Sequence, residues 1–144
     1  MVEVKFYDQV ADELLKFAVI IAKTENKWVF CKHKERDTYE VPGGHREAGE
    51  DISETAKREL REETGAIDFN IEPICVYSVK GKTRINENFD DETFGMLFVA
   101  NISSFEELHS EIEKILITDK LVDNWTYPFI QPKLLEEAKN RGFI

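Results

Sequence analysis

Three glutamates, Glu59, Glu62 and Glu63, stand at positions i, i+3 and i+4 of a segment with helical periodicity. At about 100° per residue, their side chains project from one third of the helix circumference. Like charges at this spacing repel by a few tenths of a kcal/mol per pair. Hard divalent cations, above all Mg²⁺ or Mn²⁺, use such concentrated carboxylate oxygen. The spacing favours a metal site; the alternative is an exposed acidic face.

The residues before these glutamates strengthen the metal interpretation. Gly44 can offer its backbone carbonyl to the same ion, and we expect residues 42–44, Pro-Gly-Gly, to form a tight turn. Arg58 is next to the first glutamate, and Glu50 stands just before the helix. An Arg58–Glu50 ion pair would tie the turn to the helix and orient the glutamates.

Together these residues resemble the Nudix box, G-x5-E-x7-R-E-U-x-E-E-x-G-U, in which U is bulky and aliphatic. The chain matches every fixed letter with Gly44, Glu50, Arg58, Glu59, Glu62, Glu63 and Gly65, and departs only at Ala66, a packing position. The resemblance implies hydrolysis of a nucleoside diphosphate linked to a group X. It also implies that Glu59, Glu62, Glu63 and the Gly44 carbonyl hold Mg²⁺ or Mn²⁺, with Glu50 and Arg58 as orienting residues.

The general base stays open at this stage. In the family it is a glutamate of the box or of a later loop, which gives the candidates Glu62, Glu63, Glu106, Glu107, Glu111 and Glu113. We favour Glu111, because it precedes a strand and could swing over the box. The alternative is that Glu111 is an ordinary loop carboxylate.

Substrate recognition must come from outside the box. His45, Lys34 and Arg36 are the candidates for phosphate contacts, and Asn124 and Trp125 for contacts to a base. Each has a plain alternative, since basic residues often end strands in solvent and aromatic residues are usually core.

Residues 123–136 loosely resemble the MutT-like subset of the family, which acts on oxidised purine triphosphates. We therefore expect cleavage of such a nucleoside triphosphate to monophosphate and pyrophosphate. Dinucleotide polyphosphates, nucleotide sugars and capped RNA are the other substrates considered. A Nudix-fold module that binds nucleotides without hydrolysis is the rival function, but such modules commonly lose box glutamates.

The rest of the chain predicts one domain, 1–144, with the Nudix fold: a three-layer α/β/α sandwich around a mixed sheet. Apolar or alternating runs predict the strands, 2–6, 17–22, 28–32, 39–41, 69–79, 93–102 and 112–117. Helices are expected at 51–65, capped by Asp51 and Gly65, and at 131–141.

Composition limits the partners. A net charge of −10 disfavours duplex nucleic acid, whose binding needs a basic surface, but permits a phosphate compound bridged by a cation. No apolar run is long enough for a membrane helix, and no signal peptide is recognisable. Cys31 and Cys75 lie in apolar runs, as expected of reduced thiols in the cytoplasm. A small nucleotide is the expected partner, and the oligomeric state stays open.

Overall fold

The computed structural model describes residues 2–83, 86, 88, 91–107 and 112–144, with only the backbone for 112 and 113. Seven strands form one sheet in the order β1-β5-β6-β2-β3-β7, with β4 paired to β2. The elements are β1 (Glu3–Tyr7), the 3-10 turn η1 (Asp12–Leu14), β2 (Leu15–Thr24), β3 (Lys27–His33), β4 (Gly43–His45), α1 (Ile52–Thr64), β5 (Ala66–Lys80), β6 (Glu92–Phe105), β7 (Ile112–Thr118) and α2 (Gln131–Asn140).

The sheet is mixed, as the sequence predicts. β2 pairs with β6 in parallel, and the other strand pairs are antiparallel. β2 and β3 form a hairpin, whose turn places Glu25 and Asn26 at positive φ, a conformation that Asn adopts more readily than most residues.

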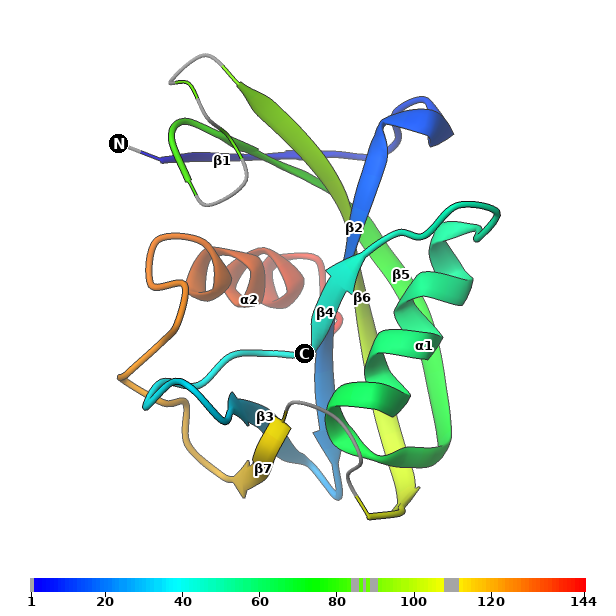
Figure 1. Ribbon diagram of the computed structural model, residues 1–144, viewed down its shortest axis with the longest axis vertical. Coiled ribbons are helices and arrows are strands. Elements are labelled where there is room, and N and C mark those ends of the chain that lie inside the picture. The colour runs from blue at the N-terminus through cyan, green and yellow to red at the C-terminus, as the bar shows by residue number, and fades with distance from the viewer. Residues whose placement is uncertain (1, 84–85, 87, 89–90, 108–111) are drawn as a thin grey trace.

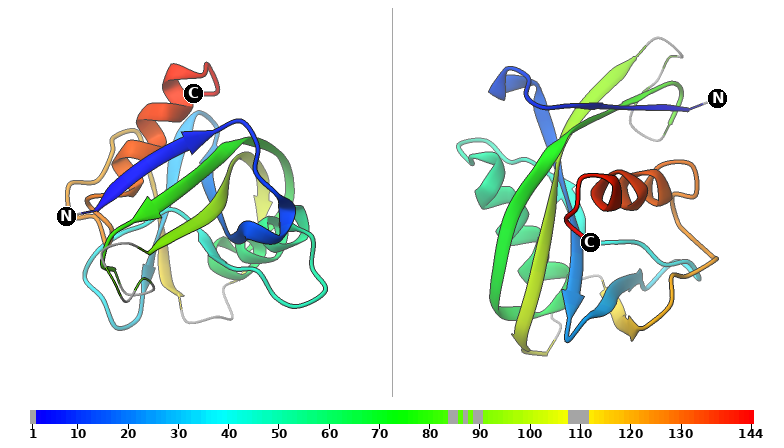
Figure 2. Two further views of the ribbon diagram at one scale, coloured as in Figure 1. Left: turned by 90° about the horizontal axis from the view of Figure 1, so that it is seen from above. Right: turned by 180° about the vertical axis from the view of Figure 1, so that it is seen from behind.

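The sheet separates two helices, α1 on one face and α2 on the other (Figures 1 and 2). One apolar cluster, which includes Ala56 and Leu60, packs α1 on the sheet. A second cluster, which includes Leu134 and Ala138, packs α2 on the opposite face. The three-layer prediction is therefore confirmed, because each helix buries one stripe against one face.

Helix α1 begins and ends as predicted. The Asp51 carboxylate accepts the backbone N–H of Glu54 at 2.9 Å and so caps the first turn. Gly65 takes φ 77°, and its N–H donates to the carbonyl of Arg61. Ile52, Ala56 and Leu60 are buried. Glu59 and Glu63 lie on nearly the same side of the helix as Ile52, so these two carboxylates point towards the fold.

Two local predictions were wrong. Residues 39–41 form only isolated bridges, Cys31 with Glu40 and Tyr39 with Trp125. Residues 43–45 form strand β4, where we expected a turn. Neither Gly43 nor Gly44 has a positive φ. Glycine is required in this strand for another reason. A Cβ on Gly43 would lie 2.6 Å from the Ala18 carbonyl oxygen of β2.

The later strands are longer than the runs that predict them. β5 is one strand that shifts register beside Pro73, and β6 continues to Phe105, three residues beyond the predicted strand 93–102. In the described part of the chain, no helix is both long and apolar enough to cross a membrane.

Candidate active site

Arg58 connects the start of α1 to the predicted metal ligands. Its Nε and Nη2 lie 2.7 and 3.1 Å from the two carboxylate oxygens of Glu50, and Nη2 also donates to the His45 carbonyl at 2.9 Å. Its Nη1 lies 2.7 Å from a Glu59 oxygen and 3.4 Å from a Glu62 oxygen. The predicted Arg58–Glu50 ion pair is confirmed, and it joins β4, the following loop and α1.

The Glu50 carboxylate is held by several hydrogen bonds. Besides Arg58, its oxygens accept the backbone N–H of Glu47 and the hydroxyl of Thr55, both at 2.9 Å. The Arg58 guanidinium and these donors lower the pKa of Glu50 to about 2. The Glu50 carboxylate in turn raises the pKa of Arg58. Both groups therefore stay charged throughout the pH range in which proteins fold.

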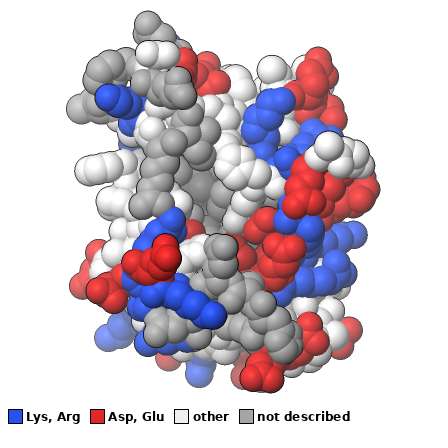
Figure 3. Space-filling view, viewed as in Figure 1, with Lys and Arg blue, Asp and Glu red and all other residues white. Residues whose placement is uncertain are grey.

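Glu59 lies against the backbone of Gly44. A Cβ on Gly44 would fall 2.4 Å from the Glu59 carboxyl carbon, so only glycine leaves room for this carboxylate. The Glu59 side chain is 12% exposed. Burial, followed by the negative charge of Glu63, raises the pKa of Glu59 to about 7 in the metal-free protein. Figure 3 shows acidic side chains gathered on this face, over α1.

Glu63 is held at both of its oxygens. One accepts the backbone N–H of Gly43 at 2.7 Å, and the other lies 3.4 Å from Nε2 of His33. The close approach of Glu63 raises the pKa of His33. Glu62 differs from Glu59 and Glu63, because its side chain is 52% exposed at the outer rim of the site.

These residues fit a divalent cation. Among the described residues, no three His, Cys, Asp or Glu side chains are grouped so that they could hold a metal ion, and Arg58 contacts two of the expected ligands, Glu59 and Glu62. However, Glu59 and Glu63 are two nearly buried carboxylates, and burial, followed by the negative charge of Glu63, raises the pKa of Glu59. A hard cation relieves such repulsion, and carboxylate and carbonyl oxygens are the ligands it prefers.

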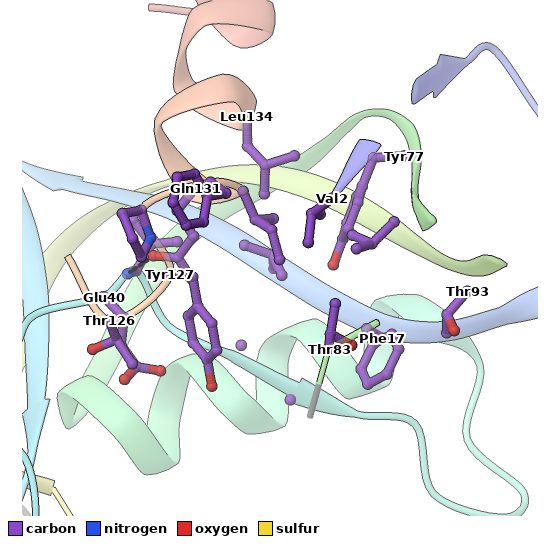
Figure 4. A pocket seen from close by; sticks show the side chains of 18 of the residues that line it. Val2, Phe17, Glu40, Tyr77, Thr83, Thr93, Thr126, Tyr127, Gln131 and Leu134 are labelled. Atoms are coloured by element: carbon purple, nitrogen blue, oxygen red, sulfur yellow. Dashed lines mark hydrogen bonds between the residues drawn. The ribbon is translucent and has the colours of Figure 1, made fainter. Parts of the chain in front are cut away.

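A cavity of about 590 Å³ opens beside Gly43, Gly44 and Glu63. Its apolar wall includes Phe17, Val41, Tyr77, Tyr127, Phe129 and Leu134. In Figure 4, Tyr127 and Gln131 lie on one side of the cavity, with Phe17 and Thr93 on the other. The volume and the mostly apolar lining are typical of small-molecule sites. One end therefore offers carboxylates, and the body of the cavity offers apolar and aromatic surface.

The predicted substrate-binding residues divide into two groups. His45 and Arg36 line the cavity, although Arg36 also donates to Glu40 at 3.0 Å. Lys34, Asn124 and Trp125 are not among the lining residues. The Asn124 amide donates to the carbonyl of Asp37, and Trp125 packs edge-on against Phe30 at 5.4 Å.

The later-loop candidates for general base are only partly described. Glu111, our favoured residue, lies outside the described residues, as does the side chain of Glu113. Glu106 and Glu107 are exposed, and the Glu106 backbone N–H donates to the carbonyl of Gly65, at the C-terminal end of α1.

The sequence predictions missed several residues of this site. Glu40 is buried beside Glu63, and burial raises the pKa of its carboxyl group. Gln131 is also buried, and its Oε1 accepts the Val41 N–H at 2.9 Å. Only one signal could have found them: a charged or amide residue between apolar neighbours, as Glu40 stands in Tyr-Glu-Val.

The sequence is similar to known proteins. A family model described as NUDIX domain matches residues 14–139. Over 84 residues, the chain is 36% identical to a Bacillus subtilis (strain 168) protein named "Putative 8-oxo-dGTP diphosphatase YtkD". That match covers 58% of this chain and 52% of the relative, so the chain spans about half of the relative's length.

Solved structures extend the likeness to nearly the whole chain. A mutant of the Bacillus subtilis pyrophosphohydrolase BsRppH superposes with a TM-score of 0.78 at 26% identity, covering 99% of this chain and 92% of that one. An Ap4A hydrolase of C. elegans superposes with a TM-score of 0.66 at 15% identity, covering 88% and 96%. At that identity the second likeness shows the fold alone.

Proposed function

The chain belongs to the NUDIX domain family, and on that premise we propose that it hydrolyses a phosphoanhydride bond of a nucleoside diphosphate linked to a group X. The observation that carries the proposal is the joint placement of Glu59 and Glu63. Both carboxylates are nearly buried, and both lie against the glycines of β4 at one end of a cavity.

Glu59, Glu62, Glu63 and the Gly44 carbonyl would hold Mg²⁺ or Mn²⁺. When bound, such an ion neutralises charge on the phosphate oxygens and makes a bound water more acidic. Arg58, fixed by Glu50 at 2.7 Å, contacts Glu59 and Glu62 directly and would so orient these ligands. Glu111 remains our proposed general base.

The body of the cavity suits the nucleoside part of the substrate. Phe129 is 69% exposed at the cavity, an unusual position for a phenylalanine, and Tyr127 lies near it in the chain. A stacked base would cover the Phe129 ring and remove apolar surface from water. His45 and Arg36 line the cavity and are the residues that we assign to the phosphates, with Lys34, Asn124 and Trp125 left as weaker sequence-based proposals.

We propose a purine nucleoside triphosphate, oxidised at the base, as the substrate, with monophosphate and pyrophosphate as products. The names of two relatives support it, one an 8-oxo-dGTP diphosphatase and the other a pyrophosphohydrolase. Cys31 and Cys75 are free and buried, which supports our proposal of a cytoplasmic protein. The superposition over 99% of the chain supports our proposal of a single domain, 1–144.

A product analysis tests this function. The protein is incubated with Mg²⁺ and a panel of nucleoside triphosphates, oxidised purine triphosphates, dinucleotide polyphosphates and nucleotide sugars, and the products are separated by chromatography. We expect monophosphate and pyrophosphate from the triphosphates, fastest with an oxidised purine. Binding of a nucleotide with no Mg²⁺-dependent product would instead identify a module that binds without hydrolysis.

A further inference from the structure

His33 lies between two carboxylates that come from different parts of the chain. Its Nε2 is 3.4 Å from an oxygen of Glu63 on α1 and 3.6 Å from an oxygen of Glu40 in the loop before β4. Both neighbours are carboxylate oxygens, which accept hydrogen bonds, so the form of His33 with a proton on Nε2 suits this position. His33 therefore offers one N–H to the pair of acids.

Glu40 is fixed in its own position. Its backbone exchanges two hydrogen bonds with Cys31 on β3, at 2.8 and 3.0 Å. Its side chain is 7% exposed, and the oxygen that does not face His33 accepts from Arg36 at 3.0 Å. Arg36, Glu40, His33 and Glu63 thus form a row of groups that ends at a proposed metal ligand.

Both carboxylate oxygens of Glu63 have a contact, one with His33 and the other with Gly43. The Gly43 N–H binds one oxygen at 2.7 Å, and His33 faces the other, so rotation of this carboxylate would break both contacts. Each carboxylate oxygen has a second lone pair, which stays available to a cation or a water. A buried acid with no such contacts could rotate among several conformers.

We propose that His33, supported by Glu40, is the positioning residue that holds Glu63 ready for a divalent cation. The role acts through Glu63 and not on the substrate, and it rests on the proposed function. Loss of comparable outer contacts costs about 10- to 100-fold in metal affinity or activity.

The test compares two replacements of His33 in the full chain. His33→Leu removes the donor, whereas His33→Gln keeps an N–H near the position of Nε2. Mn²⁺ binding without nucleotide is measured by electron paramagnetic resonance. We expect His33→Leu to raise the Kd for Mn²⁺ about 10-fold or more and to lower kcat with little change in KM, while His33→Gln restores most of both.

A matched control separates positioning from folding. Val29→Ala shortens a fully buried side chain on the same strand, β3, so it should lower Tm and leave the Kd for Mn²⁺ unchanged. Should His33→Leu not fold, Glu40→Gln provides the second variant. It is expected to weaken Mn²⁺ binding as His33→Leu would, and an unchanged Kd in Glu40→Gln would refute the supporting role of Glu40.

The outcomes distinguish this inference from the proposed function. If Glu63→Gln binds Mn²⁺ as the natural protein does, the metal site itself is wrong. If Glu63→Gln loses Mn²⁺ while His33→Leu keeps the natural Kd and kcat, only the positioning role is refuted. A loss in Val29→Ala equal to that in His33→Leu would also refute it.

Discussion

Replacing Gly44 with alanine should damage the site while leaving the fold nearly intact. The added Cβ would lie 2.4 Å from the Glu59 carboxyl carbon and 2.5 and 2.6 Å from its oxygens. Ordinary contact between carbon atoms begins near 3.5 Å, so the Glu59 carboxylate must move by about 1 Å. A displacement of that size at a catalytic centre costs about 100-fold in rate.

The fold should tolerate the same change, because the obstructing atoms are the end of a flexible side chain. Moving Glu59 off its rotamer costs about 0.5–1.5 kcal/mol. Gly43→Ala gives the opposite expectation, since its Cβ would meet the backbone carbonyl of Ala18, 2.6 Å away. That clash disturbs the β2–β4 pairing and should lower the free energy of unfolding by about 1–3 kcal/mol.

The assay measures the free energy of unfolding by urea titration, and kcat for triphosphate hydrolysis over a range of Mg²⁺ concentrations. Gly142→Ala is the control: its φ of 83° makes alanine unfavourable there, but nothing lies within 4 Å of the added Cβ. It should lose some stability and keep its kcat. If Gly44→Ala keeps the natural kcat, the close packing of Glu59 on Gly44 is unimportant for catalysis and the reasoning is refuted.

Two further predictions concern the cavity wall and the buried acid. Phe129→Ala should raise KM for a purine triphosphate and leave kcat nearly unchanged, since Phe129 is proposed to stack on the base; an unchanged KM would place the base elsewhere. For Glu59, the pKa in the folded, metal-free protein is raised from 4.5 to about 7, so the neutral form stabilises the fold. Its contribution is complete below pH 4.5 and is lost as the pH rises through 7. Across that range, the free energy of unfolding from urea titrations should therefore fall less steeply with pH for Glu59→Gln than for the natural protein. Identical slopes for the two proteins would contradict the raised pKa of Glu59.

Local sequence signals predicted those parts of the protein that depend on near neighbours. Asp51 and Gly65 bound a helix whose periodicity places its apolar residues on one side, and the structure confirms both ends. Arg58 and Glu50 are eight residues apart, within reach across a helix start, and their ion pair is present at 2.7 Å.

The Pro-Gly-Gly sequence shows how one signal can have two causes. Glycine permits both a tight turn and the close approach of another group. Residues 43–45 use the second property, because β2 lies against Gly43 and the Glu59 carboxylate lies against Gly44. Nothing in the neighbouring sequence distinguishes these two uses.

The cavity could not be predicted, because residues far apart in the chain build it. Phe17, Tyr77 and Gln131 come from β2, β5 and α2, and the two aromatic residues alone resemble core residues. Asn124 and Trp125 had the right chemistry for a base. However, the Asn124 carbonyl accepts the Tyr39 N–H at 3.0 Å, which ties this segment to the loop before β4.

The central claim is that the carboxylates on α1 bind the cation that hydrolysis requires. It is tested most directly by the Mg²⁺ dependence of pyrophosphate release from a saturating nucleoside triphosphate by Glu59→Gln. The matched control, Glu136→Gln, makes the same change at an exposed position on α2. We predict that Glu59→Gln falls to near the metal-free rate at any Mg²⁺ concentration while the control matches the natural protein. Release by Glu59→Gln at the natural rate and with the natural Mg²⁺ dependence would contradict the claim.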